Sequence, residues 1–464
     1  MMEEPKGRPV GGTEYSWCRA VPGGTGIAVL AILTSKTLES LKLQNAINKL
    51  QKLHPVLRSK LHRNPSKNSF SFITSSTPYV QIKSFNLSST RKILESLNPP
   101  TKNLPISPLQ SLLEHELNQN VWWCSNDNNE NDMFLASMYS LPNEKWVVVL
   151  RLHVSACDRT TAVSLLRELQ ELVGEAEEEK EERGGKVVNE INLGIEDLIP
   201  SGKVKKSLWT RGIDMLSYSM NSFRSTNLKF IDVNSPRCSQ VVRIQMNKDE
   251  TERIISGCKS RGIKLCGALA AAGVMAAQST KRSQSDRKYA VVTFTDCRSI
   301  LEPPLSAHHF GFYHSAIMNT HIIRGGEQLW ELAKKMYMAF ANSKKSNRHF
   351  SDMADLNFLM CKAIENPGLT SSSSLRTSLM SVFEDTVVDD CNEKHQELVG
   401  LEDYIGCASV HGLGPSMALF DTLRGGRLDC VCVYPSPLHS REQMQGMVDC
   451  MKSILVNSVT ECGE

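Results

Sequence analysis

The segment Arg151-Leu-His-Val-Ser-Ala-Cys-Asp-Arg159 is predicted to form a corner, where the chain turns from a strand into a helix. The run before it, from Trp146 to His153, is apolar and rich in valine, which predicts a buried strand. After the corner, apolar residues recur at helical spacing at positions 162, 165, 166, 169, 172 and 173, which predicts a helix. We therefore expect the functional residues of the chain at this corner, where polar side chains lie between a strand and a helix.

Strands and helices alternate on both sides of the corner. The first half predicts a strand over 27–33, a helix that ends before His54-Pro55, and a hairpin of residues 133–139 and 146–153. The second half predicts a helix of small residues over 265–277 that is buried on every side. Further segments complete the predicted pattern: strands over 240–246, 289–295, 312–323 and 427–434, and helices over 327–340, 352–364 and 441–455.

This alternation predicts an α/β protein of two comparable halves. The predicted N-terminal lobe covers residues 1–185 and the C-terminal lobe covers 241–464. A crossover segment over 186–240, with a short helix near 209–223, is expected to join them.

The composition excludes some classes of function. Lys and Arg total 53 against 50 Asp and Glu, a net charge of +3, which favours neither nucleic acid nor a membrane surface as a partner. The most apolar stretch, Ile27 to Leu33, is far shorter than the about 20 residues that span a bilayer. The first residues lack the apolar segment of a secretory signal, and the 14 cysteines are scattered. We therefore expect a cytoplasmic protein with reduced, mostly buried thiols.

Several segments, in chain order, resemble one enzyme family. Leu53-His-Pro-Val-Leu-Arg58 closes the first predicted helix, and the corner and the small-residue helix follow it. Asp296-Cys-Arg298 and Gly311-Phe-Tyr313 come next. Together they resemble the superfamily of CoA-dependent acyltransferases, which includes chloramphenicol acetyltransferase, the condensation domains of peptide synthetases, the alcohol acetyltransferases and the BAHD enzymes.

The resemblance implies a fold and a reaction. It implies two chloramphenicol-acetyltransferase-like lobes with a tunnel between them. An acyl group bound to CoA or to a carrier would enter from one side, and a small alcohol or amine acceptor would enter from the other. Acyl-CoA would be a co-substrate, no cofactor would be bound permanently, and the chain is expected to be a monomer.

The corner departs from the family motif. In His-x-x-x-Asp-Gly the histidine deprotonates the acceptor, while the aspartate pairs with an arginine to hold the corner in shape. Matching Asp158 to the motif aspartate places Val154 at the position of the base and Arg159 at that of the glycine. Valine cannot accept a proton, and a positioned general base contributes about 10²–10⁴ in rate. The motif is therefore degenerate at two positions.

His153 has two interpretations. Neighbouring side chains of a strand face opposite sides, so His153 should point away from the position where the base is needed. A bulge of one residue would turn it into the tunnel as a displaced base. Without a bulge, it is a buried, hydrogen-bonded structural histidine.

Other residues near the corner have expected roles. Asp158 and Arg298 are expected to form a structural pair, with Gly311 supporting the same region. Cys157 is interpreted as a small core residue rather than a thiol nucleophile, because no neighbour that would lower its pKa is evident.

Histidines further along the chain are candidates to replace the missing base. His308, His309 and His314 could supply a base or a metal site from the second lobe, but their spacing matches no familiar ligand motif and we expect no metal. His411 is a further candidate for a residue of the passage, with an ordinary loop histidine as the alternative.

Two functions follow from these observations. The first is an acyltransferase that moves an acyl group from acyl-CoA to a small alcohol or amine. The second is a catalytically inactive relative, a binding or scaffolding protein that keeps the passage without the base.

Overall fold

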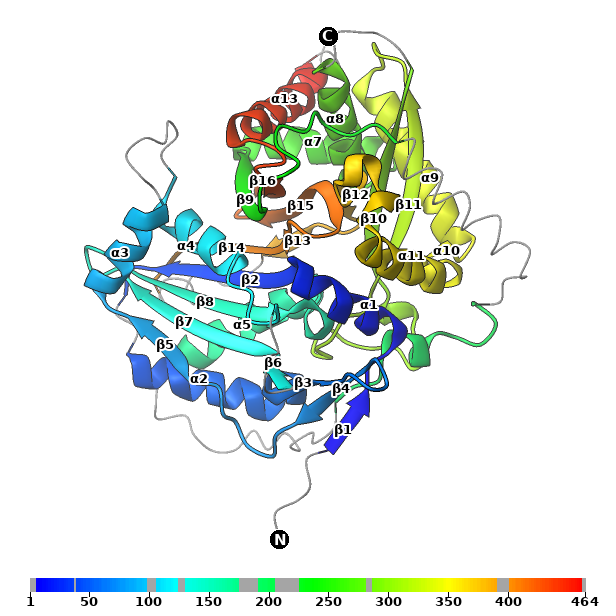
Figure 1. Ribbon diagram of the computed structural model, residues 1–464. Helices are drawn as coiled ribbons and strands as arrows, with labels where there is room; N and C mark the ends of the chain where they lie inside the picture. Colours follow the sequence, from blue (N-terminus) through cyan, green and yellow to red (C-terminus); the bar gives the residue numbers. More distant parts are fainter. Residues whose placement is uncertain are drawn as a thin grey trace.

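Two large β-sheets organise the chain in the computed structural model (Figure 1). The structure describes residues 6–36, 39–97, 106–123, 130–174, 191–204, 225–280, 286–389 and 400–460. The helix expected near residues 209–223 lies outside these ranges, as do parts of the predicted crossover segment.

The first sheet has the strand order β14-β2-β8-β7-β5, with bounds Leu401–Val410, Thr25–Thr34, Trp146–His153, Phe134–Ser140 and Ile82–Phe85. The predicted hairpin is confirmed, because β7 and β8 pair as antiparallel neighbours. Strand β2 is almost entirely apolar, so both of its faces need cover. Helices α2 (Ser40–Leu53) and α5 (Arg159–Gly174) share a core with one face, and α4 (Pro108–Leu117) shares one with the other.

Smaller elements complete this half. A four-stranded sheet has the order β1-β4-β3-β6, with bounds Lys6–Pro9, Ser69–Thr74, Ser59–Asn64 and Glu130–Asp132. Helix α1 (Gly12–Ala20) precedes β2, and α3 (Leu87–Leu97) lies against α4.

The second sheet has the order β11-β10-β12-β15-β16-β9, with bounds His314–Ile323, Arg287–Asp296, Arg376–Phe383, Gly414–Arg424, Arg427–Ser436 and Cys238–Gln245. A short strand, β13 (Val387–Asp389), pairs with β15. One face is covered by helices α7 (Lys248–Ser260), α8 (Leu265–Ser279), α9 (Leu329–Lys345) and α13 (Arg441–Thr460), which lie together at the top of Figure 1.

Close packing of the small-residue helix α8 is confirmed. A side-chain carbon added at Gly267 would lie 2.8 Å from Tyr337 Cβ and 3.0 Å from the carbonyl oxygen of Ala333 on α9. One added at Gly273 would lie 2.6 Å from Met380 Sδ on the sheet. The small side chains of α8 therefore allow a helix on one side and a sheet on the other to approach it.

One strand crosses between the halves of the sequence. Strand β14 belongs to the second half, yet it pairs with β2 at the edge of the first sheet. Its side chains Ile405 and Cys407 share a core with Val431 and Val433 of the second sheet. The predicted boundary at residue 241 therefore divides the sequence into two halves but not the sheets, because one strand of the second half belongs to the first sheet.

Helix α11 (Met353–Glu365) follows the short helix α10 (Arg348–Ser351) and packs against α1 of the first half. In the described ranges, no single helix is long and apolar enough to cross a membrane. Helices α7 and α8 pass that test only as a pair, with a bend of 107° between them.

Candidate active site

The corner at residues 153–159 has the predicted strand, turn and helix. Strand β8 ends at His153, a single 3-10 turn covers Val154–Ala156, and α5 begins at Arg159. The backbone N–H of Thr161 donates to Asp158 Oδ1 at 2.8 Å, so this carboxylate caps the first turn of α5. The corner is thus held by the side chain that also carries its main charge.

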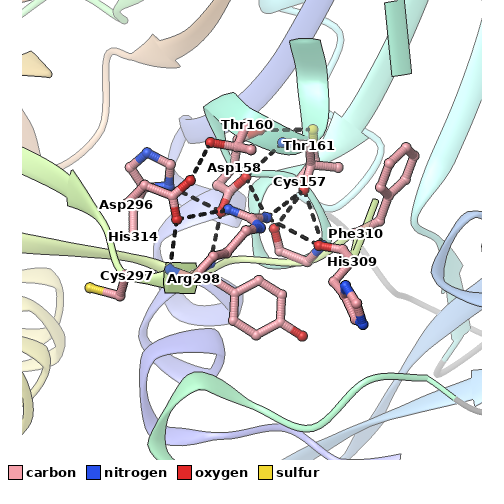
Figure 2. A network of polar contacts seen from close by, with 12 residues as sticks. Cys157, Asp158, Thr160, Thr161, Asp296, Cys297, Arg298, His309, Phe310 and His314 are labelled. Carbon is pink, nitrogen blue, oxygen red and sulfur yellow. Dashed lines mark hydrogen bonds and ion pairs between the residues drawn. The ribbon is translucent and has the colours of Figure 1, made fainter. Parts of the chain in front are cut away.

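The predicted pair of Asp158 and Arg298 is present, and both side chains are buried. Arg298 Nη1 donates to Oδ2 at 2.8 Å and Nη2 donates to Oδ1 at 3.0 Å, while the backbone N–H of Tyr313 donates to Oδ2 at 2.8 Å (Figure 2). Burial alone would raise the pKa of Asp158, but Arg298 and His314 hold it well below its ordinary value. The carboxylate is therefore ionised at neutral pH.

Gly311, in the second half of the chain, forms hydrogen bonds with the corner. Its carbonyl oxygen accepts from the backbone N–H of Asp158 at 3.1 Å and from the Thr161 hydroxyl at 3.0 Å. A side-chain carbon at this position would lie 2.8 Å from the ring of Tyr313. Glycine therefore lets the loop approach the corner closely enough for these bonds.

His153 lies away from the candidate site. Its Nδ1 accepts a hydrogen bond from the backbone N–H of Ser155 at 3.2 Å. Its ring packs edge-to-face with the ring of Trp122, and the two ring centroids lie 5.3 Å apart. Strand β8 pairs with β2 in unbroken register up to His153, so the bulge that would turn this side chain is absent. Burial lowers the pKa of His153 to about 3. The displaced-base interpretation therefore has no support in the geometry, because the imidazole is fully buried in the body of the protein.

A cavity of about 370 Å³ lies between the two sheets. From the first half of the chain, β2, the corner and α5 line the cavity, together with β14 at the edge of the first sheet. From the second sheet, β10, β11, β12 and β15 line it, together with helix α11. Most of the side chains that line it are apolar, among them Leu30, Leu166, Phe294, Met318, Leu359 and Phe420. It lies where the resemblance implies a tunnel, and a passage open at both ends stays a prediction.

Val154 and Leu152 line this cavity, as the alternation of the strand predicts when His153 faces the other way. An aliphatic side chain therefore occupies the cavity wall at the position where the sequence resemblance predicts the base.

His314 lines the same cavity. It is the first residue of β11, and its Nδ1 lies 3.0 Å from Asp158 Oδ2, a contact at ion-pair distance whose N–H direction is oblique for a hydrogen bond. The rings of Phe383 and Phe312 lie beside the imidazole, with ring centroids 5.9 Å and 6.4 Å from its own centroid. The buried carboxylate of Asp158 thus lies beside one ring nitrogen of His314 (Figure 2), a residue that lines the cavity.

Arg159, which the sequence resemblance matches to the motif glycine, connects the two halves. Its guanidinium donates to the backbone oxygen of Asp385 at 3.0 Å and contacts Asp421 on β15 at 3.1 Å. It also lies over the ring of Phe383, 4.4 Å from the centroid. Arg159 therefore fills part of the cavity wall and ties α5 to the second sheet.

The remaining histidine candidates do not reach the cavity. His308 Nδ1 contacts Glu168 at 2.9 Å on the surface, and His309 Nδ1 accepts from the backbone N–H of Ser306 at 3.1 Å. His411 Nδ1 contacts the Ser239 hydroxyl at 3.0 Å, and burial lowers its pKa to about 4. Within the described part of the chain, no three His, Cys, Asp or Glu side chains come together as a metal site.

Cys157 lines the cavity edge but is fully buried, and burial together with the charge of Asp158 raises its pKa well above the ordinary thiol value. A thiolate is therefore disfavoured there. Sequence reasoning missed the cavity walls from β12, β14 and β15, because their apolar residues are typical of any buried strand.

The comparisons with known proteins give a fold and no sequence family. No family model matches the sequence, and no curated protein matches it. Polyketide synthase associated protein 5 from Mycobacterium tuberculosis is similar in structure with a TM-score of 0.66 and 15% identity, over 98% of this chain and 99% of that one.

Two further structures are similar over most of both chains. The TRI3 trichothecene 15-O-acetyltransferase from Fusarium sporotrichioides has a TM-score of 0.69 and 13% identity, covering 98% of each chain. The condensation domain of the monacolin K polyketide synthase MokA has a TM-score of 0.63 and 10% identity, also covering 98% of each chain. The predicted fold is therefore confirmed: this chain has the two-lobed α/β fold of acyltransferases and condensation domains.

Proposed function

We propose that this protein transfers an acyl group from a thioester donor, with acyl-CoA as the expected donor, to a small alcohol or amine bound in the cavity. One observation carries the proposal: an imidazole, His314, lines the cavity and is held by the ionised carboxylate of Asp158. The fold shared with acyltransferases supports the choice of reaction.

His314 would act as the general base. Asp158 favours the tautomer with the proton on Nδ1, which leaves the lone pair of Nε2 for the acceptor. Nε2 takes the proton of the acceptor hydroxyl or amine while the acceptor heteroatom attacks the thioester carbonyl carbon. The tetrahedral intermediate then expels the thiolate, which receives the proton from His314 and leaves as free thiol.

Asp158 would serve this reaction as a positioning residue. Arg298 fixes the carboxylate through two hydrogen bonds, and the carboxylate in turn orients the imidazole. A buried carboxylate that keeps its charge also stabilises the imidazolium formed when the acceptor loses its proton.

The test compares two matched histidine variants. His314→Asn keeps a donor toward Asp158 and removes the nitrogen proposed as the base, whereas His153→Asn keeps an acceptor toward Ser155. Purified proteins are incubated with a panel of acyl-CoAs and acceptors, and acceptor-dependent release of free CoA is measured. We expect His314→Asn to lower kcat by about 10²–10⁴ and His153→Asn to leave it within a few-fold. Equal turnover by His314→Asn and the wild type would overturn the assignment of the base.

A second function is favoured by Val154, whose aliphatic side chain lines the cavity at the position of the family's base. In that case the protein is a binding or scaffolding relative. Acyl-CoA would then raise the melting temperature in the absence of any release of CoA. Acceptor-dependent turnover by the wild type excludes this alternative. Acyl-CoA as co-substrate, a monomeric state and a cytoplasmic location stay predictions.

A further inference from the structure

Three phenylalanine rings form a row across the second sheet. Phe294 on β10, Phe383 on β12 and Phe420 on β15 come from adjacent strands, and all three line the cavity. Phe294 and Phe383 are register partners with ring centroids 5.5 Å apart, and the centroids of Phe383 and Phe420 lie 5.3 Å apart. None of the three residues is fully buried, so each keeps accessible surface that a molecule in the cavity can contact.

The neighbouring row on the same face of the sheet has smaller side chains. Val292, Ser381 and Ala418 are register partners on the same three strands, each two residues before a phenylalanine, and all line the cavity. Side chains two residues apart on a strand face the same side of the sheet. The three rings therefore stand above the smaller residues beside them and form a wall of the cavity.

The proposed base lies beside this row of rings. The imidazole of His314 packs edge-to-face against the ring of Phe383, with an angle of 82° between the ring planes. Its other aromatic neighbour, Phe312, has its ring centroid 5.3 Å from that of Trp17 on α1. All four of these residues line the cavity. A substrate group that reaches His314 would therefore place its adjacent atoms beside aromatic rings.

The distances in this wall match the geometry that aromatic rings prefer. Aromatic pairs favour offset-stacked or edge-to-face arrangements with centroids about 4.5–7 Å apart, and such a pair contributes more than the apolar area it buries. The charge that touches the wall is already paired, because Arg159 lies over the ring of Phe383 and forms an ion pair with Asp421 at 3.1 Å. The wall therefore favours a flat, uncharged ring, and a cavity of about 370 Å³ admits a small molecule that carries one.

We propose that the wall of Phe294, Phe383 and Phe420 binds an aromatic ring, and that a substrate of the proposed reaction carries that ring. The second clause rests on the proposed function, whereas binding of the ring does not. The ring can belong to the acceptor or to the acyl group, since both substrates must meet beside His314.

Binding is measured by ligand-detected NMR titration with a matched pair of alcohols, 2-phenylethanol and 2-cyclohexylethanol. The cyclohexyl compound has the larger apolar surface, so a wall that is merely apolar would bind it more tightly. We expect the wild type to prefer the phenyl compound by about three- to tenfold, the effect of an aromatic contact. Equal affinities, or tighter binding of the cyclohexyl compound, would overturn the proposal.

Leucine variants locate the preference. Phe383→Leu keeps an apolar side chain and removes the central ring of the wall, so we expect it to abolish the preference for the phenyl compound. Phe294→Leu makes the same test at the end of the row, and it replaces Phe383→Leu if that variant fails to fold. Phe358→Leu is the matched control, because Phe358 on α11 is 49% exposed and lies outside the cavity lining, whereas its neighbour Leu359 lines the cavity. Loss of the preference in Phe358→Leu, or its persistence in both cavity variants, would contradict the assignment.

Turnover assays identify which substrate carries the ring. The same two alcohols are compared as acceptors, and phenylacetyl-CoA is compared with cyclohexylacetyl-CoA as the donor, with release of free CoA as the readout. A higher kcat/KM for the phenyl member of either pair supports the proposal and assigns the ring to that substrate. A preference in binding without any release of CoA would refute the proposed function and leave the ring site standing. Turnover that favours neither phenyl member would refute a substrate ring at this wall and leave the proposed function standing.

Discussion

Replacing Asp158 with asparagine tests the corner most directly. The substitution keeps the size of the side chain and removes a charge that faces Arg298 Nη1 at 2.8 Å and Nη2 at 3.0 Å. Both side chains are at most 4% exposed, so water cannot solvate the guanidinium that remains. In the variant, Arg298 keeps Asp296 as a carboxylate neighbour, with Oδ1 of Asp296 at 3.2 Å from Nη1 of Arg298. Removing one partner of such a buried pair costs about 3–5 kcal/mol, and we expect a decrease of that size in the free energy of unfolding.

The assay is urea unfolding followed in parallel by tryptophan fluorescence and circular dichroism. Asp385→Asn is the control, because Asp385 pairs with Lys264 at 2.7 Å on the surface, where both side chains are well exposed. A surface pair contributes about 0–1 kcal/mol. Equal losses in the two variants would refute the view that the buried pair holds the corner.

The same pair predicts a pH dependence. The pKa of Asp158 is lower in the folded chain than the about 3.9 of an unfolded aspartate, so the folded state binds fewer protons. Its stabilisation is complete above about pH 4 and is lost as the pH falls further. Asp158→Asn should therefore differ most from the wild type at neutral pH and least in strong acid. A difference that stays constant down to pH 2 would contradict this account.

Two further predictions concern packing and acid sensitivity. Gly267→Ala should lower the free energy of unfolding by about 1–3 kcal/mol, because the new carbon would lie 3.0 Å from the backbone of α9. Gly446→Ala on α13, where nothing lies within 4 Å, should be neutral or stabilising, and equal melting temperatures would refute the packing argument. For His153, burial lowers the folded pKa to about 3 against about 6.5 unfolded, so the unfolded state takes up the proton first as the pH falls. The wild type should therefore lose up to about 1.4 kcal/mol per pH unit below pH 6.5 that His153→Asn retains, and parallel curves of unfolding free energy against pH would contradict it.

Local signals were sufficient to predict much of the corner. The valine-rich run and the helical spacing after it correctly predicted β8 and α5. The orientation of His153 followed from alternation along the strand, because no bulge interrupts the register. The pairing of Asp158 with Arg298, 140 residues apart, came from the resemblance and not from any local pattern.

Other features depend on how distant segments meet. Strand β14 was not predicted, since its sequence pattern does not reveal β2 as its partner across more than 360 residues. His314 was one of several histidine candidates, and only its 3.0 Å contact with Asp158 across the two halves distinguishes it.

The position of β14 in the first sheet has a consequence for expressing the first half of the protein as a separate fragment. A fragment ending near residue 240 would lack β14 and expose the backbone N–H and C=O groups along one side of β2. An apolar edge of that length is a template for intermolecular pairing, so such a fragment should aggregate rather than behave as an autonomous folding unit. Supplying residues 400–412 as a separate peptide would restore the missing edge and should recover solubility in the manner of strand complementation.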